Sequence, residues 1–242
     1  MDCPKNAEFV DYYKKGLISA VSFLETEKFV LLAEHILKAR DSNGTIYILG
    51  NGGSASIAAH FAHNLNWDAS AKLEDQKKLK ALALHENLCH LTGLANDRHY
   101  DQIFVEQLRN FLRRNDIVIG ISASGNADNV FNALKYAKER KNFTISLSGN
   151  DGGKIAKVAN LPLVVPSFDQ QIIEDVMQTI CHITVRTIFY KEFGFIENHL
   201  MFADIAILRE KDAYLRYRNF KEKECLSKGK GRKKWFFLKA IV

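Results

Sequence analysis

The sequence predicts an α/β protein: a three-layer, Rossmann-like domain in which a five-stranded parallel sheet lies between layers of helices. Strand-like segments alternate with helix-like segments, and the strands are continuous apolar runs rather than alternating ones. Such runs are typical of strands that helices cover on both faces. A chain of 242 residues, 47% hydrophobic and 26% charged, is long enough to bury one sizeable core.

The chain begins with a helical segment. Between residues 7 and 39, apolar side chains recur at helical spacing with a break near 26–28, and a turn cluster follows at 41–44. Residues 45–49 (TIYIL) are short and rich in β-branched side chains, which predicts the first strand. A glycine-rich turn then leads into a helix over 56–65.

The remaining elements continue the alternation of strand and helix. Four further apolar runs are expected to be strands, and four further segments have the spacing of helices. The strands are expected at 79–84, 116–121, 142–147 and 161–165, and the helices at 101–113, 130–140, 154–159 and 172–190.

Two loops of similar chemistry connect a strand to the following helix, Gly50–Ser56 and Ser122–Asn129. The first turn of a helix leaves N–H groups unpaired and favours an anion, glycines allow close approach, and serine hydroxyls can donate to phosphate oxygens. We therefore expect a phosphate site at the carboxyl edge of the sheet. No lysine follows the glycines, and the spacing is not G-x-G-x-x-G, which argues against a nucleotide loop. The alternative is that both are ordinary tight turns with capping serines.

Composition excludes several classes of protein. No segment approaches the roughly 20 uncharged apolar residues of a membrane span, and the start of the chain lacks an apolar signal core, so we expect a cytoplasmic protein. The cysteines are scattered without a C-x-x-C pair, which argues against a zinc knuckle. Residues 216–239 hold ten basic and two acidic side chains and thus +8, so the remainder sums to −2 against the net +6. The positive charge belongs to a tail, and a nucleic-acid partner is not expected.

Five segments together resemble the SIS (sugar isomerase) domain family, and specifically its phosphoheptose isomerase branch. The resemblance covers roughly residues 9–190, and its segments lie at 50–61, 95–97, 120–130, 147–156 and 166–182. It implies N-terminal helices at 1–44 that pack on the domain and on an oligomer interface. It also implies an SIS domain at 45–197, which leaves an extension at 198–242 that is basic from about 216.

The resemblance also implies an activity. The branch interconverts sedoheptulose 7-phosphate and D-glycero-D-manno-heptose 7-phosphate, an aldose–ketose isomerisation that supplies nucleotide-activated heptose for lipopolysaccharide or capsule. It further implies a homotetramer with active sites between subunits. The implied substrate contacts are Asn51, Gly52, Gly53, Ser54, Asn96, Asp97, Ser122, Ala123, Ser124 and Glu174.

Zinc is often bound in this family by a His and a Glu on the helix after the first loop, together with a Gln and a His eight residues apart on a late helix. The matching positions here are His60 and Asn64, then Glu174 and His182. The family's proton-transferring glutamate is thus Asn64, an amide that cannot accept the proton. We expect Glu174 to be the base and His182 the acid or a metal ligand, with His60, Glu174 and His182 as the possible zinc ligands.

Three points stay open. Asp68 is an alternative ligand, and Ala127 stands where the family has a fourth hydroxyl in the second loop. Eight helical residues rise roughly 12 Å, so either the late helix begins after Glu174 or the site combines residues of two subunits. Two competing functions remain. The chain is a non-catalytic SIS protein that binds a sugar phosphate or a protein, or it is an SIS isomerase of hexose or pentose phosphates.

Overall fold

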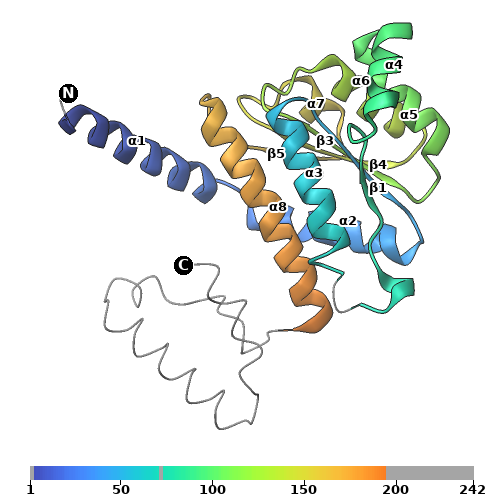
Figure 1. Ribbon diagram of the computed structural model, residues 1–242. Coiled ribbons are helices and arrows are strands. Elements are labelled where there is room, and N and C mark those ends of the chain that lie inside the picture. The colour runs from blue at the N-terminus through green and yellow to red at the C-terminus, as the bar shows by residue number, and fades with distance from the viewer. Residues whose placement is uncertain (1–2, 71–72, 195–242) are drawn as a thin grey trace, which may run out of the picture. The chain divides into compact units, whose positions relative to one another are not determined.

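Five parallel strands form a single sheet between helices, as the sequence predicts (Figure 1), and the structure gives their order as β2-β1-β3-β4-β5. The computed structural model describes residues 3–70 and 73–194, so the expectations for the extension at 198–242 lie outside the described residues. The strands are β1 (Ile46–Leu49), β2 (Ala81–Ala83), β3 (Ile117–Ser122), β4 (Phe143–Ser148) and β5 (Leu161–Val164).

Successive strand residues face two separate hydrophobic clusters, which makes the domain three-layered. On β1, Ile46 and Ile48 lie in one cluster, and Tyr47 and Leu49 lie in the other. The first cluster packs under α2 (Thr26–Asp41), α3 (Gly53–Asn66) and α8 (Gln170–Phe193). The second packs under α5 (Ile103–Phe111), α6 (Asp128–Glu139) and α7 (Gly153–Val158). Burial on both faces explains why the strands read as continuous apolar runs.

The N-terminal helical segment is two helices, α1 (Cys3–Ser22) and α2, separated at residues 23–25. The sequence places this break slightly late, at 26–28. The Tyr13 hydroxyl donates a 2.7 Å hydrogen bond to Asp175 Oδ2 on α8, which ties α1 to the domain. This contact raises the pKa of Tyr13 to about 12, because the hydroxyl donates to a carboxylate. Much of the apolar surface of α1 remains exposed, including Phe9, Tyr12 and Ile18, as does Phe23 in the turn that follows.

One helix is absent from the sequence expectation, α4 (Leu88–Asp97). None of its residues is fully buried, although Leu91, Leu94 and Ala95 lie at helical spacing and pack, partly buried, against the second cluster. A local signal does exist, since the Asn87 side chain accepts a hydrogen bond from the His90 backbone N–H and caps the helix. Short 3₁₀ turns occur at Asp75–Lys77 and Tyr100–Gln102.

The strand order places the two predicted loops side by side. The chain passes from β1 to β2 on one side and then returns to β3 on the other, so β1 and β3 are neighbours at the switch of direction. In open parallel sheets of this order, ligands bind outside the carboxyl ends of the strands at that switch point. The loops after β1 and β3 both lie there.

Candidate active site

The first loop, residues 50–52, ends β1 and leads into α3 three residues earlier than the sequence predicts, because α3 begins at Gly53 rather than Ser56. Gly52 adopts φ 53° and ψ −122°, a conformation that glycine readily adopts and other residues do not. Ser54 is buried in the first turn of α3. The leading N–H groups of that turn have no intrahelical partner, so the loop offers donors to an anion or a polar oxygen.

The carboxylate of Glu174 lies against this loop. A Cβ atom added at Gly53 would be 2.5 Å from Glu174 Oε2 and 2.6 Å from Oε1, so only glycine leaves room for the carboxylate there. Gln170, one turn earlier on α8, donates a hydrogen bond of 3.3 Å to Glu174 Oε1. Because α8 begins at Gln170, the expectation that the helix could begin after Glu174 is wrong.

The second loop follows β3 and is fixed by its neighbours. Ser122 is buried at the end of the strand, with its Oγ 3.4 Å from Ser124 Oγ. Gly125 has φ 70°, and an added Cβ would be 2.4 Å from the Gly152 carbonyl oxygen of the next loop. The Gly149 N–H also donates to the Ala123 carbonyl. The loops after β3 and β4 therefore support each other, which gives the serine hydroxyls a rigid frame.

Ala127 occupies the N-cap of α6, and no side chain caps the helix there. A serine or threonine at an N-cap commonly accepts a hydrogen bond from the first turn. The hydroxyl that the family has at this position would therefore have served both helix and loop. Its loss leaves Ser122 and Ser124 as the serines of the second loop.

Asn96 and Asp97 lie at the C-terminal end of α4, where both are exposed. The Asn96 side-chain amide donates a 2.9 Å hydrogen bond to Asp97 Oδ1. No contact between this pair and Glu174 is recorded among the described residues, so they remain predicted substrate contacts rather than parts of an assembled site.

His60 on α3 and His182 on α8 form a second polar group. Their ring centroids are 5.2 Å apart with the rings nearly perpendicular. Burial lowers the pKa of His182, the positive charge of a protonated His60 lowers it further, and Asp68 acts in the opposite direction. The Gln178 side-chain amide lies one turn away on α8, with its Nε2 3.0 Å from His182 Nε2, and holds the ring by a hydrogen bond.

The possible zinc ligands do not converge within one chain. Glu174 and His182 lie eight residues apart on the continuous helix α8, a rise of roughly 12 Å. Asn64 is buried and offers an amide where the family has a carboxylate. In residues 3–70 and 73–194, no group of three His, Cys, Asp or Glu side chains is arranged to bind a metal ion. Within one chain only His60 and His182 lie close together, and the amide of Asn64 is a poor zinc ligand, so no step below uses a zinc ion.

Three residues at this edge are absent from the sequence prediction. Asn129 and Tyr100 form hydrogen bonds to Asn51. A sequence pattern cannot reveal these contacts, because the partners lie on different elements. His85 follows β2, and its buried Nδ1 has no hydrogen-bond partner among the described atoms. Burial lowers the pKa of His85, which favours its neutral form.

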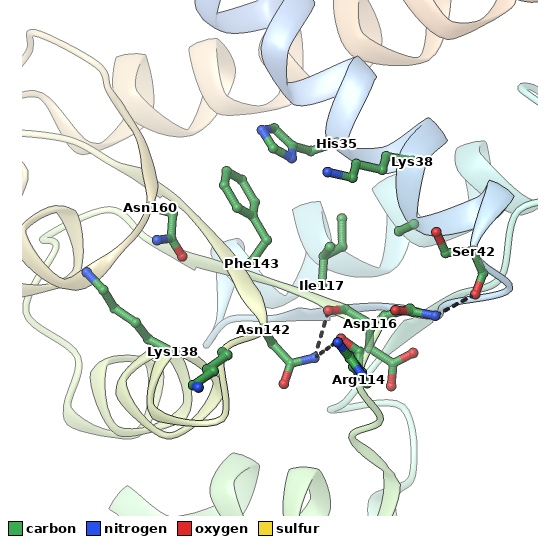
Figure 2. Close-up of a pocket in the computed structure, with 13 residues that line it drawn as sticks. His35, Lys38, Ser42, Arg114, Asp116, Ile117, Lys138, Asn142, Phe143 and Asn160 are labelled. Carbon is green, nitrogen blue, oxygen red and sulfur yellow. Dashed lines mark hydrogen bonds between the residues drawn. The ribbon is translucent and has the colours of Figure 1, made fainter.

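A cavity of about 360 Å³ lies at the opposite, amino edge of the sheet (Figure 2). Its lining includes Lys38 in the last turn of α2 and Lys138 in the last turn of α6. Cations at helix C-termini complement the helix dipole, which accounts for this basic character. The one carboxylate there, Asp116, accepts hydrogen bonds from the backbone N–H groups of Thr45 and Arg113. Ligands of open parallel sheets bind at the carboxyl ends of the strands, so this cavity at the amino ends is not the expected substrate site.

Gly53→Ala is expected to lower kcat about 10²-fold with little change in melting temperature. The added methyl group displaces the Glu174 carboxylate, while the Gly53 backbone does not have a positive φ and accepts alanine. Gly93→Ala on α4 is the matched control, since its Cβ meets no atom within 4 Å. A Gly53→Ala variant with the activity of the Gly93→Ala variant would show that the carboxylate position is unimportant.

Known proteins resemble the chain both in sequence and in fold. The family model described as the SIS domain matches residues 9–149. A phosphoheptose isomerase of Helicobacter pylori is 40% identical over 148 residues, 61% of this chain and 76% of that protein. One of Citrifermentans bemidjiense is 39% identical over 160 residues, 64% of this chain and 82% of that protein. The structure of phosphoheptose isomerase GmhA from Neisseria gonorrhoeae matches with a TM-score of 0.68 at 32% identity, covering 76% of this chain and 97% of that chain.

Proposed function

The chain belongs to the SIS domain family, and from this membership we propose that it is a phosphoheptose isomerase that interconverts sedoheptulose 7-phosphate and D-glycero-D-manno-heptose 7-phosphate. The observation that carries the proposal is the Glu174 carboxylate against Gly53, at the carboxyl edge of the sheet beside the second loop. A base next to a donor-rich loop is what an aldose–ketose isomerase requires.

The two loops divide the substrate between them. A phosphate dianion beside Glu174 would be repelled by the carboxylate, so the first loop does not hold the phosphate. The second loop has Ser122 and Ser124 and lies at the start of α6, and it takes the phosphate on C7. The first loop then holds C1 and C2, at the far end of the sugar. This refines the expectation that both loops bind phosphate.

The reaction is a pair of proton transfers with no net oxidation of the protein. Glu174 removes a proton from C1 of the ketose, the C–H electrons form the C1–C2 double bond, and the carbonyl electrons move to O2, which an acid protonates. The resulting enediol gives the proton of O1 to the conjugate base of that acid, and Glu174 delivers a proton to C2 to give the aldose. His182 is the proposed acid, and because burial lowers its pKa, the neutral ring donates this proton through its N–H at neutral pH.

An assembly of identical subunits reconciles the positions of these two groups. Glu174 and His182 of one chain are too far apart on α8 to act on adjacent atoms. We propose that each site takes Glu174 from one subunit and His182 from another, in a homotetramer. The exposed apolar side chains of α1 and of the turn that follows it, which include Phe9, Tyr12, Ile18 and Phe23, supply surface for such an assembly.

In this proposal, the product supplies nucleotide-activated heptose for surface polysaccharide, and the isomerisation takes place in the cytoplasm. Within the part of the chain that the structure describes, none of the helices combines the length and apolar character of a bilayer span.

Incubation of the full chain with sedoheptulose 7-phosphate is expected to yield the aldose, detected by NMR. We expect kcat/KM for fructose 6-phosphate and ribulose 5-phosphate to be lower by about tenfold or more. Treatment with EDTA is expected to leave the rate within about twofold, because the fourth position beside His60, Glu174 and His182 is Asn64, whose amide is a poor zinc ligand.

The outcomes separate the competing functions. Preference for a shorter sugar phosphate would indicate another SIS isomerase. Thermal stabilisation by sedoheptulose 7-phosphate without turnover would indicate a sugar-phosphate-binding regulator. Loss of activity on chelation with recovery on zinc addition would contradict the metal-independent step.

A further inference from the structure

Two hydrogen bonds join the two loops at the switch point of the sheet, and a third joins the first loop to the 3₁₀ turn at Tyr100–Gln102. Asn51 Nδ2 donates to Asn129 Oδ1 at 2.8 Å, and Asn129 Nδ2 donates back to Asn51 Oδ1 at 2.9 Å. The Tyr100 hydroxyl donates to Asn51 Oδ1 at 3.1 Å. The loop after β1, the start of α6 and the 3₁₀ turn at Tyr100–Gln102 therefore meet on a single side chain.

The orientation of both amides is determined by the backbone. The Val130 N–H, which can only donate, lies 2.9 Å from Asn129 Oδ1, so that atom is the oxygen. The reciprocal pairing then fixes which atom of Asn51 is nitrogen. Asn129 is only 3% exposed, so the pair is held rigidly at one end.

Counting donors and acceptors shows what Asn51 can offer to a ligand. Both lone pairs of Asn51 Oδ1 are used, one by Asn129 and one by Tyr100. One N–H of Nδ2 is used by Asn129, and the other remains. The Asn51 side chain can therefore donate to a substrate oxygen but cannot accept from a hydroxyl.

We propose that Asn129 and Tyr100 are positioning residues that hold Asn51 as a hydrogen-bond donor to the oxygen that becomes negatively charged in the enediolate. The inference rests on the proposed function and names a part of its site. Asn51 is two residues before Gly53, whose Cα faces the Glu174 carboxylate, so the donor lies on the loop against which the base on α8 packs. A fixed donor placed where charge develops lowers the barrier without reorganisation.

Asn129→Asp tests this role with a minimal change. Aspartate keeps the length of the side chain and an oxygen for the Val130 N–H, but its second oxygen faces Asn51 Oδ1 instead of donating to it. Tyr100→Phe removes only the hydroxyl from an exposed ring. Both variants are combined with Asn51→Ala in double-mutant cycles.

We expect kcat to fall about tenfold in Asn129→Asp and about threefold in Tyr100→Phe, with KM changed by less than about twofold. In the Asn51→Ala background neither change should lower kcat further, because both residues act through Asn51. Affinity for a phosphorylated sugar hydroxamate, which mimics the planar enediolate, is measured by calorimetry and should weaken by the same factors. Melting temperatures control for damage to the fold.

The results distinguish this inference from the proposed function. Additive losses in the Asn51→Ala background, or a rise in KM with kcat unchanged, would overturn the positioning role in an active enzyme. If the wild-type chain binds the hydroxamate without turning over sedoheptulose 7-phosphate, the proposed function fails. The positioning role still stands in that case if the affinity cycle shows that Asn129 acts through Asn51.

Discussion

Glu174→Gln is expected to lower kcat for sedoheptulose 7-phosphate by about 10²–10⁴-fold. The amide has the size of the carboxylate and can occupy the same space against Gly53, but it cannot accept the C1 proton. Phosphate contacts at Ser122 and Ser124 are untouched, so KM should change little. Steady-state kinetics and a thermal shift on the same preparation separate a loss of chemistry from a loss of fold.

Asp175→Asn is the matched control for that variant. Asp175 is the next residue on α8, is exposed, and accepts a hydrogen bond from Tyr13, which an asparagine oxygen can still accept. Its activity should stay within about twofold of wild type, in line with ordinary surface substitutions. A Glu174→Gln variant as active as Asp175→Asn would remove Glu174 from the role of base.

Mixing two inactive variants is expected to restore activity. Glu174→Gln and His182→Ala should each be inactive alone. In a randomly mixed assembly whose sites take one residue from each of two subunits, about a quarter of the sites contain both intact residues. The separation of the two side chains along α8 is the reason to expect this arrangement.

The mixed assembly is prepared by denaturing and refolding the two variants together, and its rate is compared with each variant refolded alone. Recovery near a quarter of the wild-type rate supports a shared site. If mass spectrometry verifies mixed oligomers and no activity is recovered, the shared site is contradicted. A site formed within one chain predicts that result, because every chain carries one of the two defects.

The sequence was sufficient for the fold because the strands are buried on both faces. Residues 117–121 show this as an uninterrupted apolar run, whereas residues 143–148 alternate apolar side chains with buried Thr and Ser; the predicted strands at 116–121 and 142–147 differ from β3 and β4 by one residue. Helix α4 was missed although it has a short apolar face at Leu91, Leu94 and Ala95, because none of its residues is fully buried. Helix boundaries at α3 and α8 shifted because glycine and Asp169 caps set them.

The site was less accessible from the sequence. The loops were identified by their glycines and serines, which are local signals. The contact of Glu174 with Gly53 joins residues more than a hundred positions apart, and the pairing of Asn51 with Asn129 joins two loops, so both needed the tertiary structure. The relation of His182 to Glu174 in the proposed site lies between subunits, so it cannot be read from one chain.

Isomerisation in deuterium oxide tests most directly whether Glu174 carries a proton between C1 and C2. A carboxylate base exchanges its proton with solvent during the life of the enediol. We expect deuterium at C2 of the aldose that the wild-type chain forms, and we expect Glu174→Gln to form no such aldose. Deuterium at C2 of aldose that Glu174→Gln forms at the wild-type rate would contradict a proton transfer through Glu174.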